Sequence, residues 1–114
     1  MQEKPLLGKV AVVTGAGNSI GLGRAMTLAL VRAGAWVAMM DVNEASLEQT
    51  ASDIREIGGD KSVITVVGDV SSPDDAEMAV RRAVTELGGL HILVNNAGIA
   101  TRGLVQGPES RVKF

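Results

Sequence analysis

The sequence of 114 residues contains no cysteine and no tyrosine, and only one histidine, one tryptophan and one phenylalanine. The absence of cysteine excludes disulfides, thiolate nucleophiles and cysteine-based metal sites. A single histidine cannot form a metal cluster with itself, and we expect His91 to be an ordinary strand residue. We therefore predict that this chain has no metal site.

A strong charge and a long apolar run are also missing. The formal net charge of −2 gives no sign of a nucleic-acid or membrane-surface partner. No stretch is long enough to span a membrane, and the N-terminal "MQEKPLLGK" lacks the apolar core of a signal peptide. We expect no nucleic acid, no membrane partner and, by default, a cytoplasmic location.

The residues that are present alternate between two patterns typical of a globular α/β domain. Short, continuous apolar runs predict buried strands over 9–14, 36–41, 62–69 and 90–96. Amphipathic segments predict helices that begin near Gly21, Asn43 and Ser72 and end at Gly34, Gly58-Gly59 and Gly88. The expected apolar faces are Leu47, Ala51 and Ile54 in the second helix, and Ala76, Val80, Ala83, Val84 and Leu87 in the third.

This alternation predicts a Rossmann-like, doubly wound parallel sheet. Continuous apolar strands separated by helices favour a parallel sheet that is covered on both faces. Right-handed crossovers then favour the strand order 3-2-1-4. The first two helices should cover one face of the sheet and the third helix the other.

The segment "VVTGAGNSIGLGRA" (12–25) is the first candidate site. A glycine-rich turn between a strand and a helix lets the backbone approach a pyrophosphate, and the helix offers free N–H groups and a positive dipole end. Gly15 can make the tight turn, while Gly21 and Gly23 open the helix. The alternative is a tight turn that holds no ligand.

Two aspartates end predicted strands at the same carboxyl side of the sheet. Asp41 stands 20 residues after Gly21 and can accept both ribose hydroxyls of an adenosine, while it repels a 2′-phosphate. No arginine or lysine stands at 16–20 or just after Asp41, so the pattern favours NAD over NADP. Asp69 would lie near the adenine. Asp41 could instead be an acid at a helix N-terminus that the helix dipole stabilises, and Asp69 could be a turn or capping residue.

Taken together, Thr14-Gly15-x-Gly17, Gly21-x-Gly23, Asp41, Asp69-Val70 and "NNAG" (95–98) resemble the short-chain dehydrogenase/reductase family over about residues 9–103. The resemblance implies a bound dinucleotide cofactor, with the pyrophosphate at Gly15, Gly17, Gly21 and Gly23, the ribose at Asp41, the adenine at Asp69 and Val70, and Asn95, Ala97 and Gly98 near the cofactor. Aligned from Thr14, the middle glycine of the usual family pattern becomes Ser19 and Gly21 is the last glycine. Aligned from "GLGRA", which we prefer, Gly21 and Gly23 fit and the turn has two extra residues around Asn18-Ser19. The roles of Gly17, Asn18 and Ser19 stay open.

The resemblance implies only the cofactor-binding half of such an enzyme. The family's proton-transfer group is the Tyr of a Tyr-x-x-x-Lys helix, and this sequence has no Tyr, so no catalytic position carries over. We expect an incomplete NAD-binding domain over 6–103, truncated after the fourth strand, and an atypical tail over 104–114. The exposed fourth strand should favour self-association.

Three functions remain open on the sequence. The chain could be the cofactor-binding part of an oxidoreductase that transfers a hydride between NAD and an unknown alcohol or ketone. It could also be a non-catalytic nucleotide- or partner-binding module, or an inactive, truncated gene product.

Overall fold

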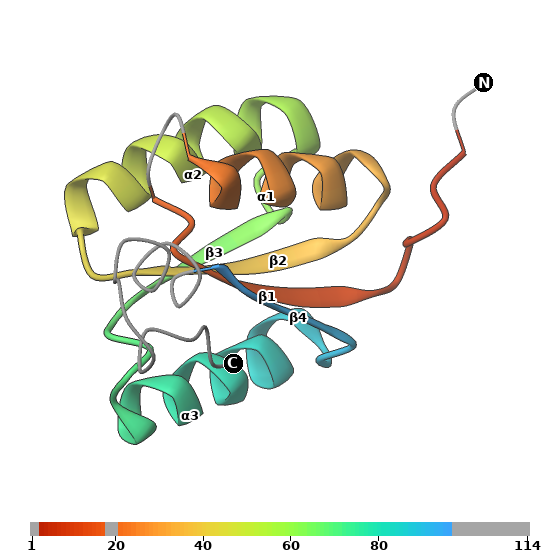
Figure 1. Ribbon diagram of the computed structural model, residues 1–114. Helices are drawn as coiled ribbons and strands as arrows, with labels where there is room; N and C mark the ends of the chain where they lie inside the picture. Colours follow the sequence, from red (N-terminus) through yellow and green to blue (C-terminus); the bar gives the residue numbers. More distant parts are fainter. Residues whose placement is uncertain (1–2, 18–20, 97–114) are drawn as a thin grey trace, which may run out of the picture.

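The computed structural model describes residues 3–17 and 21–96 (Figure 1). Four parallel strands form one sheet in the order β3-β2-β1-β4, which confirms the predicted topology. The strands are β1 (Val10–Thr14), β2 (Trp36–Asp41), β3 (Val63–Val67) and β4 (Ile92–Asn95). The predicted boundary between residues 103 and 104 lies outside the described residues.

The helices begin and end close to the predicted residues. They are α1 (Leu22–Arg32), α2 (Glu44–Gly58) and α3 (Pro73–Arg82), and α3 continues into a π-helical turn, η1 (Ala83–Leu87). Asn43 Oδ1 accepts the N–H of Ser46 (3.0 Å), and Ser72 Oγ accepts the N–H of Asp75 (3.3 Å). These side chains satisfy free N–H groups of the first turns, as expected of N-caps.

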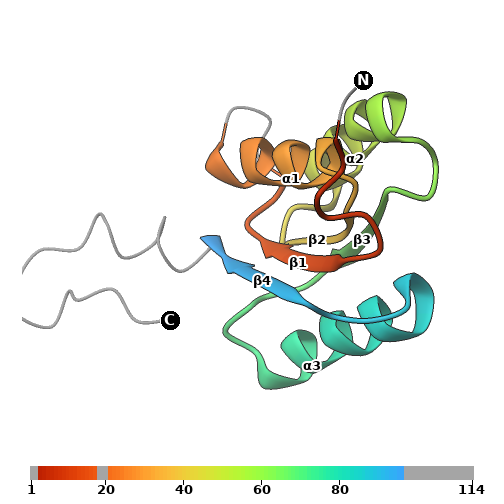
Figure 2. The same ribbon diagram turned by 90° about the vertical axis from the view of Figure 1, so that its right-hand side faces the viewer.

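The sheet lies between two helical layers, with α1 and α2 on one face and α3 on the other (Figures 1 and 2). Successive residues of each strand point to opposite faces. Ala11, Val13, Val37 and Met39 pack toward α1 and α2, whereas Val10, Val12, Ala38 and Met40 pack toward α3 and η1. Because both faces are buried, both sets are apolar, and the strands appear in the sequence as continuous apolar runs.

The buried face of α3 and η1 differs from the predicted one. The residues that pack on the sheet are Ala79, Ala83 and Leu87, whereas Val80 and Val84 are 39% and 48% exposed. The small alanines allow the helix to approach the sheet closely, and the bulkier valines on the neighbouring row remain outside. The predicted row was therefore wrong at both valines.

The outer edge of β3 is covered by two arginines from opposite layers. The Ser62 carbonyl bonds to β2, so strand alternation turns the carbonyls of Val63 and Thr65 outward. Arg55 Nη2 of α2 donates to Val63 O (3.1 Å), and Arg82 Nη1 of α3 donates to Thr65 O (2.8 Å). Charged groups on an edge strand oppose the addition of a further strand.

β4 forms the other edge of the sheet. Within the described residues it is the last strand on its side, and Leu93 is 63% exposed. His91 extends the pairing of β4 with β1, because its backbone N–H donates to Val10 O (2.8 Å) while its Nδ1 accepts the Val10 N–H (2.9 Å). Across residues 3–17 and 21–96, no helix is both long and apolar enough to cross a membrane.

Candidate functional site

The turn after β1 requires glycine at its first position. Gly15 has φ +66°, in the left-handed region that L side chains rarely adopt. The next N–H, that of Ala16, donates to Met40 O (3.2 Å) and ties the turn to β2. Because the four strands are parallel, their carboxyl ends lie on the same side of the sheet. The predicted site residues at or just after these ends therefore lie on that side.

Helix α1 begins directly against this turn. A Cβ on Gly23 would lie 2.2 Å from Gly15 O, a separation that real Cβ atoms do not show. Gly21, at the N-cap, has no side chain to cap the helix, and the first turn of α1 holds no acidic residue. Within residues 3–17 and 21–96, no side chain caps the N–H groups of that turn, as in helix N-termini that bind anions.

Asp41 stands beside the glycine turn at the end of β2. Its carboxylate is half-buried, Oδ2 accepts the Gly17 N–H (2.9 Å), and Oδ1 accepts the Asn43 N–H (3.2 Å). Each carboxylate oxygen keeps a lone pair beyond the one used in these bonds. Asp41 can therefore hold the turn and still accept hydroxyl groups of a ligand. The contact gives Gly17 a defined place, which the sequence left open.

Asp69 lies in an exposed turn after β3. Its Oδ1 accepts the backbone N–H and the hydroxyl of Ser71, at 2.9 and 2.7 Å. These two hydrogen bonds stabilise the charged form and hold the pKa of Asp69 below its ordinary value. The geometry matches the turn interpretation of Asp69. Its role toward an adenine, with the half-buried Val70, stays a prediction.

Two asparagines at the end of β4 contact the first turn. Asn95 Oδ1 accepts the hydroxyl proton of Thr14 (3.1 Å), and the nearly buried Asn96 donates from Nδ2 to Gly15 O (3.2 Å). The chain thus fixes both the strand end and the carbonyl of the tight turn. Two further predicted positions, Ala97 and Gly98, lie outside the described residues.

One contact of this site does not follow from the sequence pattern. Thr50 of α2 is fully buried and donates its hydroxyl to Gly17 O (2.9 Å), 33 residues earlier. The available signal was a threonine within the apolar row of Leu47, Ala51 and Ile54, where a buried hydroxyl needs a partner.

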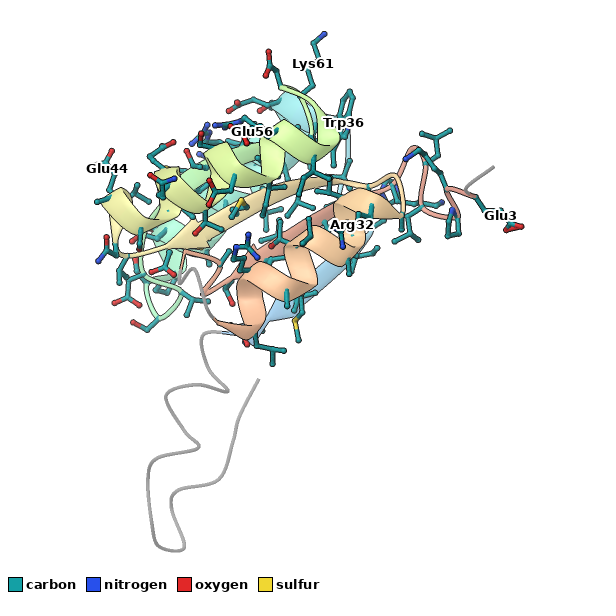
Figure 3. The ribbon with its side chains drawn as sticks, turned by 90° about the horizontal axis from the view of Figure 1, so that it is seen from above. Glu3, Arg32, Trp36, Glu44, Glu56 and Lys61 are labelled. Atoms are coloured by element: carbon teal, nitrogen blue, oxygen red, sulfur yellow. The ribbon has the colours of Figure 1, made fainter. Side chains whose placement is uncertain are left out.

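A hollow of about 360 Å³ lies at the other ends of the strands, beside the first residue of β2. Lys4, Arg32, Trp36 and Ile57 are among the residues that line it. Figure 3 shows Trp36 far from Glu44, which follows Asp41 closely in the chain. No buried side-chain nitrogen or oxygen in the described part of the chain lacks a partner, so no such atom marks a ligand in this hollow. The glycine turn, where the predicted site residues meet, stays the candidate functional site.

Known proteins with similar sequences point to one family. The sequence model of the family described as "short chain dehydrogenase" matches residues 9–112. The chain belongs to the short-chain dehydrogenase family. It is 39% identical over 99 residues to an uncharacterized oxidoreductase of Thermotoga maritima, covering 87% of this chain and 37% of the relative. A 3beta-hydroxysteroid dehydrogenase 2 of Eggerthella lenta is also 39% identical, over 82% of this chain and 35% of the relative.

Solved structures of related enzymes agree with this fold. The L-sorbose reductase of Gluconobacter frateurii, solved with NADPH and L-sorbose, matches with a TM-score of 0.76 and 32% identity, over 85% of this chain and 36% of that one. A short chain dehydrogenase of Mycobacterium smegmatis matches with a TM-score of 0.77 and 33% identity, over 84% and 39%. The chain spans little more than a third of the length of these relatives.

Proposed function

We propose that this chain binds NAD at the carboxyl edge of its sheet. It would act as the cofactor-binding part of a short-chain oxidoreductase that transfers a hydride between NAD and an alcohol or ketone. The observation that supports this most is the pairing of the glycine turn with Asp41 through the Gly17 N–H. The proposed contacts are Gly15, Gly17, Gly21 and Gly23 for the pyrophosphate, Asp41 for the ribose, Asp69 and Val70 for the adenine, and Asn95, Ala97 and Gly98 nearby.

The residues of the turn fit a bound pyrophosphate. Glycines at 15, 21 and 23 leave backbone rather than side chains at the start of α1, and there is no room for a Cβ at Gly23. The helix dipole adds positive potential at this point, and the absence of acidic residues from the first turn of α1 leaves that potential uncancelled. The bound cofactor would accept or supply the hydride, and this chain would bind and orient it.

The choice of NAD over NADP rests on Asp41. A 2′-phosphate on the adenosine ribose would meet its negative carboxylate, and the next residues, Val42 and Asn43, supply no cation. Like unit charges about 4 Å apart repel by about 1 kcal/mol even in bulk water. That energy corresponds to about fivefold in a dissociation constant. NADP is the competing cofactor, because the sorbose reductase was solved with NADPH.

Titration calorimetry with NADH and NADPH tests this proposal. The unmodified chain should bind NADH more tightly by about fivefold or more. Asp41→Ala should bring the two affinities together. Asp53→Ala is the matched control: it removes a carboxylate of α2 that accepts from Gln49 Nε2, and it should leave the preference unchanged. Equal affinity of the unmodified chain for the two cofactors would refute the role of Asp41.

We further propose that the chain of 114 residues binds cofactor without turnover. The sequence has no tyrosine, and the family resemblance places proton transfer on a Tyr-x-x-x-Lys pair. A positioned acid or base is needed for that transfer. A panel of alcohols and ketones with NAD(H) should give no change in NADH absorbance above the background rate. Turnover above that background would contradict the proposal that this chain binds cofactor without catalysis.

A further inference from the structure

The peptide groups of Gly17 are held by two side chains from different elements. Its N–H donates to Asp41 Oδ2 at the end of β2 (2.9 Å), and its carbonyl accepts the hydroxyl proton of Thr50 in α2 (2.9 Å). Gly17 itself is buried. The glycine turn is therefore tied to β2 through one bond and to α2 through the other.

Thr50 makes an unusual contact for a threonine in a helix. A helical threonine that is buried commonly donates to the carbonyl four residues earlier. Thr27 of α1 does so, with its hydroxyl 2.8 Å from Gly23 O. Thr50 is equally buried, at 0% exposure, but its hydroxyl leaves its own helix and bonds to the turn. The Thr27 hydroxyl thus bonds within its own helix, whereas the Thr50 hydroxyl bonds to the glycine turn.

The packing around Gly17 leaves little freedom for it to move. A Cβ on Gly17 would lie 3.1 Å from Asp41 Oδ2 and 3.1 Å from the backbone N and Cα of Leu47. Gly17 is thus wedged between the carboxylate and the first turns of α2. If the Thr50 bond were lost, the buried Gly17 carbonyl would have no partner from α2, and the turn would relax away from that helix.

We propose that Thr50 is a positioning residue of the dinucleotide site. Its hydroxyl holds the Gly17 carbonyl and with it the position of Gly17, whose N–H in turn fixes the Asp41 carboxylate in one orientation. This inference rests on the proposed function, because it assigns Asp41 to the adenosine ribose. Its consequence is that a residue of α2 inside the core controls the choice between NAD and NADP.

Three variants separate this role from a general effect on the core. Thr50→Val keeps the shape and removes the hydroxyl, whereas Thr50→Ser keeps the hydroxyl and removes a methyl group. Thr27→Val is the matched control, since it removes an equally buried hydroxyl that bonds within α1. Calorimetry with NADH and NADPH gives the cofactor preference of each variant, and amide hydrogen exchange of Gly17 reports the turn without any ligand.

We expect Thr50→Val to reduce the ratio of the NADPH to the NADH dissociation constant by about fivefold, the factor that corresponds to the loss of one hydrogen bond. Exchange of the Gly17 amide should accelerate by a similar factor. Thr50→Ser should keep the preference, and so should Thr27→Val even where it lowers the melting temperature. If Thr50→Val does not fold, Thr50→Ala against Thr50→Ser makes the same comparison with less side-chain bulk.

Two outcomes would overturn the inference: an unchanged preference in Thr50→Val, or an equal narrowing in Thr27→Val. If the unmodified chain binds neither cofactor, the proposed function fails, and Gly17 exchange then decides separately whether Thr50 holds the turn. Unchanged exchange in Thr50→Val would show that it does not.

Discussion

Gly23→Ala tests the close approach of α1 to the glycine turn. The added methyl group would lie 2.2 Å from Gly15 O, 2.9 Å from Gly15 C and 3.0 Å from Ala16 Cα. All three are backbone atoms of the glycine turn, so no flexible side chain can move aside. Either α1 or the turn must shift.

Two effects of this substitution oppose each other. Alanine favours a helix over glycine by up to about 1 kcal/mol, which alone would stabilise α1. Overpacking of a close contact costs about 1–3 kcal/mol. Because the obstacle here is backbone, we expect the steric cost to be larger, and the free energy of unfolding to fall by about 1–2 kcal/mol. A displaced Gly15 carbonyl should also weaken NADH binding by about tenfold or more.

Urea unfolding followed by tryptophan fluorescence measures the stability, since Trp36 is the only tryptophan and is 40% exposed at the start of β2. Ala25→Gly is the control within the same helix. Ala25 is exposed, so this change should cost only helix propensity, about 1 kcal/mol or less, and leave NADH binding unchanged. If Gly23→Ala were as stable as the unmodified chain and bound NADH equally well, the close approach would be wrong.

Three further predictions concern the turn at Asp69 and the two edge strands of the sheet. The bonds from Ser71 lower the pKa of Asp69, so they stabilise the folded chain above the unfolded pKa of the carboxyl group, and this contribution is lost as the pH falls through the lowered value. Amide exchange of Ser71 should therefore quicken in acid after correction for intrinsic rates, and a flat profile, as expected for Asp69→Asn, would contradict this. The double variant Arg55→Met, Arg82→Met should self-associate more than Arg81→Met in sedimentation, because Arg81 pairs only with the exposed Glu77 among the described residues. We propose that the unmodified chain associates through β4, so Leu93→Lys should reduce its association, and no change would argue against that edge.

The sequence was sufficient to predict the strands, the helix ends and the strand order. β-Branched runs identify buried strands wherever a sheet is covered on both faces, and Asn43, Ser72 and Gly88 act locally at helix ends. Which row of α3 faces the sheet was not predictable in the same way, because Ala79 and Val80 are both apolar. The structure buries Ala79 and leaves Val80 exposed.

The candidate site could be predicted in part. Gly15 and Asp41 were predictable because each lies at the carboxyl end of a strand, and these ends meet on one side of a parallel sheet. The bond from Thr50 to Gly17 was not, because it joins residues 33 apart through the packing of α2 on the turn. Asp69 shows a different limit. Its bonds to Ser71 establish its role in the turn, and a carboxylate engaged in this way can still accept from a ligand.

Amide and indole chemical shifts on addition of NADH test the central claim most directly. The account places a dinucleotide at the carboxyl edge of the sheet, so the N–H signals of Gly15, Gly17, Gly23, Asp41 and Val70 should shift together. The indole N–H of Trp36, beside the hollow at the opposite edge, should not shift. Shifts centred on Trp36, Lys4 and Arg32, with the glycine turn unchanged, would contradict the account.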